Sequence, residues 1–299
     1  MVRWERIGRL VYYVRVHPAS VARATVARQL SASRPAVRSF VAALAIAAVA
    51  CGPPIHVRRV APERVTADLA RSVLNSRRPS LFTENVLYRW NLEREWKKHP
   101  EDALATLRER ILAEPTGRSA VFALAELCFA HAVRTGRREY YLAASLYAYA
   151  FLFPGTQDQD LAELDPRARV AADLYNRALT DAFASRDRSH VELRSGTYSL
   201  PFGQQLAVRL DPADLQWANR RLVNFIPVGE LEVTGLGARY RQAGIGAPLA
   251  AEMVPIDPEK ADFLGREAKA PVTALLRIDE ARAQLSTRHR WRAPDIQRL

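Results

Sequence analysis

The hydrophobic pattern of the chain changes its period near residue 189, and this change limits the fold more than any other feature of the sequence. From Pro62 to about Ala184, apolar residues recur every three or four positions, which is the spacing of one face of an α-helix. After Ser189, short apolar runs alternate with polar residues and are separated by turns, as in β-strands. We therefore predict an α+β chain, with a helical region followed by a small, mainly antiparallel β region.

Within the helical region, 52–188, four helices can be placed individually. They are expected over 100–113, 119–135, 140–153 and from Asp165-Pro166 to about 183, with Pro or acids at their starts and Gly136 after the second. Ala103, Leu107 and Pro115 fit positions of a tetratricopeptide repeat. We therefore expect tetratricopeptide-like helical hairpins here.

The β region is expected over 189–278. Its candidate strands are 191–193, 197–200, 206–210, 222–226, 230–234, 249–254 and 272–278. The remaining residues, 279–299, are basic, and we expect them to form a disordered tail.

A Gly-rich, basic segment lies between two of these strand candidates. It is not a dinucleotide-binding loop, because the spacing G-x-G-x-x-G fails at Tyr240. One interpretation is an interface loop, where the backbone approaches another surface closely, and the alternative is a plain connection. The interface residues would be Gly235, Gly237, Arg239, Tyr240, Arg241, Gly244 and Gly246.

Residues 1–51 have the order of a bacterial export signal. The apolar run 40–50 has 11 residues, against the roughly 20 that span a bilayer, and Arg34 and Arg38 precede it as a positive region should. It ends in small residues before Cys51, which resembles a lipobox, although Ala48 stands where Leu is usual. We therefore predict that Cys51 is lipidated; the alternative is a buried apolar helix with a chance cysteine.

This signal implies an exported protein that is anchored by lipid to the cell envelope. Gly52 after the cysteine favours the outer membrane if the cell is Gram-negative. The region before the apolar run is unusually long, so either translation starts later, for example at Val26, or the leader is a long one.

The net charge of +12 does not indicate a nucleic-acid partner. The two ends, 1–50 and 277–299, account for +7 and +3 of it, which leaves +2 for the residues between them. A nucleic-acid binder gathers its basic residues on a folded face instead. The partner that we expect instead is membrane lipid, through the N-terminal anchor, and we expect no nucleic acid.

Motifs for catalysis or metal binding are missing. No serine lies in a G-x-S-x-G elbow, and neither H-E-x-x-H nor a P-loop is present. Cys128 and His131 lie three residues apart on one predicted helix, but two ligands do not make a zinc site. We interpret them as a core cysteine beside a boundary histidine, and we predict no catalytic residue, no metal and no cofactor.

Four long strings resemble a known family. They are YYLAASLYAYAFLFPG (140–155), RVAADLYNRALTDAFAS (169–185), NFIPVGELEVTGLGARYRQAGIGAPLAA (224–251) and PVTALLRI (271–278). In this order they resemble the N-terminal half of bacterial secreted or lipoprotein α/β-hydrolases, over roughly 66–278. The resemblance implies a hydrolase domain with its serine elbow downstream, which the chain does not reach, so we expect a frameshifted or truncated gene.

These observations lead to three hypotheses about function. The first is a membrane-anchored accessory or scaffold region of an esterase- or lipase-like protein, without its own catalytic domain, whose partner is a hydrolase domain. The second is a stand-alone envelope lipoprotein whose helical array binds other envelope proteins. The third, an enzyme with an unrecognised site in the β region, lacks any paired acid and base in the sequence.

Overall fold

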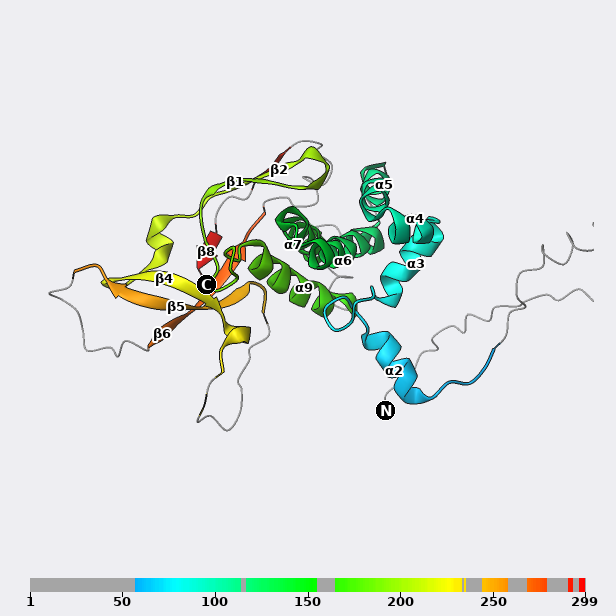
Figure 1. The fold of residues 1–299 in the computed structure, drawn as a ribbon, viewed down its shortest axis with the longest axis horizontal. Coiled ribbons are helices and arrows are strands. Elements are labelled where there is room, and N and C mark those ends of the chain that lie inside the picture. The colour runs from blue at the N-terminus through cyan, green and yellow to red at the C-terminus, as the bar shows by residue number, and fades with distance from the viewer. Residues whose placement is uncertain are drawn as a thin grey trace, which may run out of the picture. The chain divides into compact units, whose positions relative to one another are not determined.

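The computed structural model describes residues 57–113, 117–154, 165–232, 234, 244–257, 268–278, 290–292 and 296–298. Outside these ranges lie the predicted signal with Cys51, residues 279–289 of the expected tail, and the loop residues Gly235, Gly237, Arg239, Tyr240 and Arg241. Val60–Leu299 form one compact unit. Helices precede strands in this unit (Figure 1), so the predicted α+β class is confirmed.

Seven α-helices open the described part of the chain. They are α2 (Pro62–Ala70), α3 (Leu81–Arg89), α4 (Glu93–Lys98), α5 (Pro100–Ala113), α6 (Arg118–Thr135), α7 (Arg138–Leu152) and α9 (Arg167–Ala182). The last four agree with the expected helices to within two residues at either end.

The turn between α6 and α7 shows how the sequence ends a helix here. Gly136 adopts the left-handed conformation, with φ 71°, and its N–H donates to the Ala132 carbonyl oxygen (2.7 Å). Glycine reaches this conformation without a Cβ clash, which is why it commonly follows the last helical residue. The chain then reverses within two residues, so that α7 packs against α6.

The strands form two sheets. A five-stranded sheet has the order β3 (Gln216–Trp217), β4 (Arg220–Pro227), β5 (Ala247–Pro255), β6 (Lys269–Leu276) and β8 (Ile296–Arg298), and all of its neighbours are antiparallel. A three-stranded sheet has the order β1 (Gly196–Ser199), β2 (Gln205–Val208) and β7 (Arg290–Arg292). In it, β1 pairs with β2 antiparallel and β7 pairs with β2 parallel. Three short 3₁₀ segments complete the β region: η1 (Pro201–Gly203), η2 (Pro212–Leu215) and η3 (Val228–Glu230).

Two strand predictions are wrong. No strand occupies the described residues of 230–234, because β4 ends at Pro227 and the chain turns through η3. The ladder with β5 ends at the pair Pro227–Leu249, and a strand forms only where a partner edge is available. In 191–193 only isolated bridges form, from Val191 to Ala184 and to Phe225.

The prediction of a disordered tail over 279–299 also needs correction. Its described residues, 290–292 and 296–298, extend both sheets as β7 and β8. The composition of residues 279–299 did not indicate these strands, because their partner strands, β2 and β6, lie outside this segment.

Helix α9 joins the helical region to the five-stranded sheet. It packs against α7 on one side and against β5 on the other (Figure 1). Its Leu174 and Ala178 are fully buried, as are Leu249 and Ala251 of β5. The helical and β regions therefore share one core, and the expected boundary after residue 188 lies within the compact unit.

Candidate functional site

The predicted interface loop is described only at its C-terminal end, where Asn176 of α9 holds it. Asn176 Nδ2 donates to the Gly244 carbonyl oxygen (2.9 Å), and the Gly246 N–H donates to Asn176 Oδ1 (2.6 Å). Gly246 has φ +121°, and a Cβ at this position would collide with the Thr273 methyl group. Gly246 therefore lies close against β6 of the same chain, and the interface role of the loop stays a prediction.

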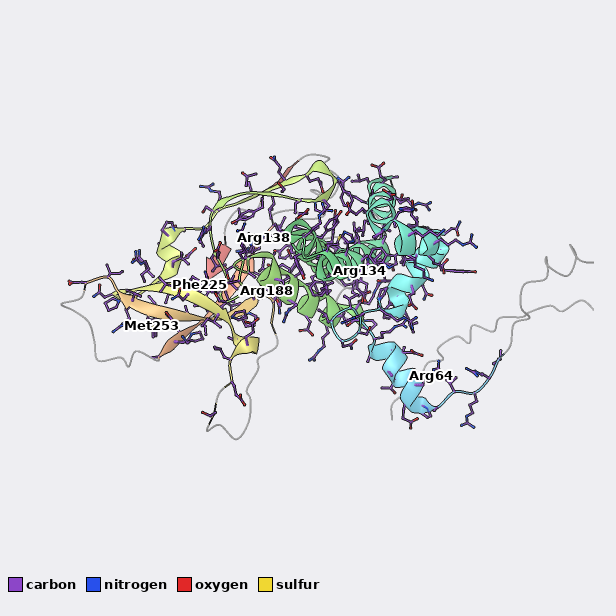
Figure 2. All side chains as sticks on the ribbon, in the orientation of Figure 1. Arg64, Arg134, Arg138, Arg188, Phe225 and Met253 are labelled. Atoms are coloured by element: carbon purple, nitrogen blue, oxygen red, sulfur yellow. The ribbon has the colours of Figure 1, made fainter. Side chains whose placement is uncertain are left out.

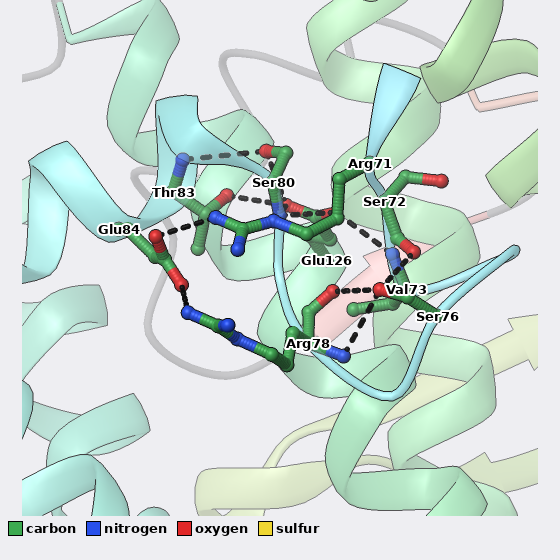
Figure 3. Close-up of polar contacts among 9 residues, drawn as sticks. All are labelled: Arg71, Ser72, Val73, Ser76, Arg78, Ser80, Thr83, Glu84 and Glu126. Atoms are coloured by element: carbon green, nitrogen blue, oxygen red, sulfur yellow. Dashed lines mark hydrogen bonds and ion pairs between the residues drawn. The ribbon is translucent and has the colours of Figure 1, made fainter. Parts of the chain in front are cut away.

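A buried carboxylate, Glu126 in the middle of α6, forms a polar cluster with the segment that joins α2 to α3 (Figure 3). The Val73 N–H donates to its Oε1 (3.1 Å), and the Ser80 N–H donates to both oxygens (3.0 Å each). The hydroxyls of Ser80 and Thr83 donate to Oε2 at 2.7 and 2.6 Å. We call these residues the Glu126 cluster. Every one of its contacts goes to the α2–α3 connection or to the first turn of α3.

Local sequence explains why the connection presents these donors. Ser80 is the N-cap of α3, and its side chain accepts a hydrogen bond from the Thr83 N–H. A helix N-terminus carries unpaired N–H groups and partial positive charge, which favour a nearby carboxylate. Beside the cluster, Glu84 of α3 accepts hydrogen bonds from Arg71 (2.5 Å) and Arg78 (3.1 Å), so the connection is held at both ends.

The electrostatics of Glu126 are governed by burial. Loss of water raises the pKa of its carboxyl above the ordinary value, although the hydrogen bonds from Thr83, Ser80 and Val73 act in the opposite direction. A raised carboxyl pKa is a feature of catalytic acids that lie in clefts. Here both oxygens are occupied by the protein's own donors and the side chain has no exposure, so the arrangement supports the fold.

Cys128 and His131, the two residues considered as metal ligands, are both buried. Cys128 is fully buried, as predicted, and burial raises the pKa of its thiol. His131 is more buried than expected: its ring meets Tyr140 edge-on at 4.4 Å, and its Nε2 lies 3.3 Å from Glu101 Oε1. Burial lowers the His131 pKa. Among the described residues, no group of three His, Cys, Asp or Glu side chains is arranged to hold a metal ion.

One contact in the β region resembles part of a catalytic triad. Ser189 Oγ lies 2.9 Å from His190 Nδ1, and His190 Nε2 lies 3.9 Å from Glu192. However, the same Ser189 hydroxyl donates to Asp187, which also accepts hydrogen bonds from Ser185 Oγ and the Ser189 N–H. These hydrogen bonds lower the pKa of Asp187 to about 2. The geometry is that of a tight surface turn, closed by one carboxylate.

A cavity beneath this turn is too small to serve a substrate. It lies between α9 and the sheet and has a volume of about 10 Å³, which is roughly that of one water molecule. Its lining is entirely apolar and includes Leu179, Phe183, Val191 and Leu276. Substrate pockets are far larger and carry a few convergent polar groups.

Comparison of the chain with models of protein families, with curated proteins and with solved structures gives no match. In the described part of the chain, every helix is either too short or too polar to cross a bilayer.

Sequence reasoning missed the residues that tie the fold together. Glu126 carried one signal, because it is the single charged residue in the apolar run 120–130. Asn176 and its neighbour Tyr175 had no comparable signal in the sequence. Tyr175 donates its hydroxyl to the Leu276 carbonyl oxygen (2.9 Å) and accepts from the Leu276 N–H (2.8 Å), which fixes α9 to the end of β6.

Proposed function

We propose that this chain is an exported protein, anchored to the cell envelope through a lipidated Cys51, and that its folded part is a non-catalytic scaffold. The proposed scaffold is the accessory region of an esterase- or lipase-like α/β-hydrolase, and its partner is a hydrolase domain. One observation carries the proposal: Arg34 and Arg38, the apolar run 40–50 and Cys51 occur in the order that export and lipid attachment require.

The geometry of the described residues is consistent with a scaffold. The buried acid Glu126 is engaged by the protein's own donors, and the Ser189–His190 contact lies on an exposed turn beside Asp187. Hydrolysis of an ester requires an activated nucleophile, a base and oxyanion donors in one site. Neither constellation supplies all three.

A second candidate function is a stand-alone envelope lipoprotein that binds other proteins through its helices. The observation that favours it is the packing of α6 against α7 and of α7 against α9, through Ala-rich helices. We propose that these helices form tetratricopeptide-like hairpins. The genomic sequence downstream separates the two candidates, because only the first requires a hydrolase reading frame with G-x-S-x-G.

The anchor is tested by expressing the chain in a Gram-negative host with labelled palmitate. Wild type and the control Cys128→Ala should incorporate label, whereas Cys51→Ala should not. Equal labelling of Cys51→Ala and wild type would contradict the proposal. In the same preparations, a fluorophosphonate probe and short-chain p-nitrophenyl esters test for catalysis. A Ser189-dependent signal above background in either assay would show that the scaffold is an enzyme.

A further inference from the structure

Helix α2 makes almost no contact with the folded body. Every described residue from Val57 to Ala70 is exposed, and α2 has no buried residue. Its C-terminus is held by Asn75, whose Nδ2 donates to the Ala70 carbonyl oxygen (2.7 Å), and by the next residue, Arg71, which pairs with Glu84 of α3. An isolated helix of nine residues is marginal in water, because nucleation is costly and few hydrogen bonds follow. No side chain caps the N-terminus of α2 to offset this cost. A surface that covers its apolar side would therefore stabilise the helix.

The residues on α2 indicate the chemistry of that partner. Val65 and Leu69 lie four positions apart on one side of the helix, with exposed fractions of 43% and 66%. Arg64, the residue before Val65, projects from the helix and is exposed (Figure 2). Over residues 57–84 the sequence carries six arginines and three acids, a net charge of +3. Helix α2 itself carries Arg64 with Glu63 and Asp68, so the positive excess lies in the segments before and after the helix. An exposed apolar side flanked by arginines suits a bilayer with anionic headgroups.

Exposed apolar surface is also concentrated at this end of the chain. In the described part, seven of the thirteen large apolar side chains that are exposed lie between Val57 and Tyr88. Ten residues separate Cys51 from Pro62, the first residue of α2, and fully extended they span at most about 35 Å. A lipid on Cys51 would therefore keep α2 within reach of the membrane surface.

We propose that α2 lies on an anionic bilayer surface with Val65 and Leu69 turned into the headgroup region, and that it sets the orientation of the scaffold on the membrane. This inference rests on the proposed anchor at Cys51, which brings the helix to the bilayer. Anchoring itself would come from the acyl chains, and α2 would add a second, weaker contact.

The test uses the full chain, processed in a Gram-negative host, purified from membranes and reconstituted into vesicles of phosphatidylethanolamine and phosphatidylglycerol. One variant, Leu69→Cys, carries an environment-sensitive fluorophore, and doxyl-labelled lipids serve as quenchers. The matched control is Ile256→Cys, because Ile256 is also apolar and 52% exposed but lies after β5. The native Cys128 is fully buried and should not take the fluorophore. Since α2 has no buried residue, substitutions on it should leave the fold intact.

We expect the doxyl lipids to quench the fluorophore at position 69 and not at position 256. With the fluorophore moved to Val65→Cys, adding Leu69→Glu should lower the population of α2 on the bilayer by on the order of tenfold. Quenching that is equal at 69 and 256, in protein that floats with the vesicles, would overturn the proposal and leave the anchor intact. Protection of position 69 from aqueous iodide without lipid quenching would also overturn it, in favour of a protein partner. Failure of the anchor is recognised separately, by the palmitate labelling of Cys51→Ala.

Discussion

Two substitutions of Glu126 separate the contribution of its hydrogen bonds to stability from the contribution of its charge. Glu126→Ala removes the acceptor for the buried Ser80 N–H and for the Val73 N–H. It also leaves a cavity at the buried position of the Glu126 side chain on α6. Each buried donor without a partner costs about 1–3 kcal/mol. We therefore expect Glu126→Ala to lower the free energy of unfolding by about 3–5 kcal/mol, from the two unpaired N–H groups and the cavity together.

Glu126→Gln should be much milder. Its amide oxygen can accept from the Val73 and Ser80 N–H groups, and its amide nitrogen can donate to the hydroxyls of Ser80 and Thr83, which accept as well as donate. The hydrogen bonds lose the extra strength that a charged acceptor gives them, but the free-energy cost of burying a carboxylate is removed as well. We expect a loss of about 1 kcal/mol, measured by urea unfolding followed by circular dichroism.

The pH dependence of these variants follows from the direction of the pKa shift. Burial raises the pKa of Glu126 in the folded state. A raised folded pKa gives stability that is present below the unfolded pKa and is lost as pH rises through the folded pKa. The stability of wild type relative to Glu126→Gln should therefore fall as the pH rises above the ordinary carboxyl pKa of 4.5. A relative stability that rises over this range, or a Glu126→Gln variant as unstable as Glu126→Ala, would refute the reasoning.

Two further predictions concern glycine geometry and thiol burial. Gly246→Ala should lower the free energy of unfolding in urea by about 2–4 kcal/mol, because φ +121° is strained for alanine and its Cβ would meet β6. The control Gly229→Ala, with open space around it, should change the free energy of unfolding by about 0.5 kcal/mol or less. Equal effects of the two substitutions would contradict this account. Cys128 should react with a thiol reagent only after denaturant is added, since its side chain is not exposed. If Cys128 of the folded protein reacted as fast as a surface thiol, the core would have to open at this position.

Much of the helical region was predictable because its signals are local. The apolar spacing of α5 to α9 and the position of Gly136 can be read within one window of sequence. The strands β5 and β6 were placed within a few residues for the same reason. The failures at 230–234 and in the tail have a different cause, because strand formation depends on an available partner edge. A window of sequence does not show which edge is free.

The polar residues of the interior were beyond prediction for a related reason. Glu126 bonds to Val73, 53 positions earlier, and Tyr175 bonds to Leu276, 101 positions later. In these two bonds the partner is a backbone group, so no residue type marks it in the sequence. The hydroxyls of Ser80 and Thr83 also bond to Glu126, from 46 and 43 positions away. Spacing rules identify side chains that act together in a motif. They do not identify a side chain whose partner is the main chain of a distant segment.

Glu126, Tyr175 and Asn176 also share a role that bears on function. Each lies on a helix and satisfies backbone groups of a segment far away in the sequence: the start of α3, the end of β6 and the end of the Gly-rich loop. Buried polar groups must be satisfied, and irregular segments present N–H and C=O groups that no ladder pairs. Side chains that are committed in this way hold connections in place, and they are not free to bind or activate a substrate. A perturbed carboxyl pKa in this interior is therefore evidence of how the connections are built, and the surfaces that remain free, above all α2, are where partners should be sought.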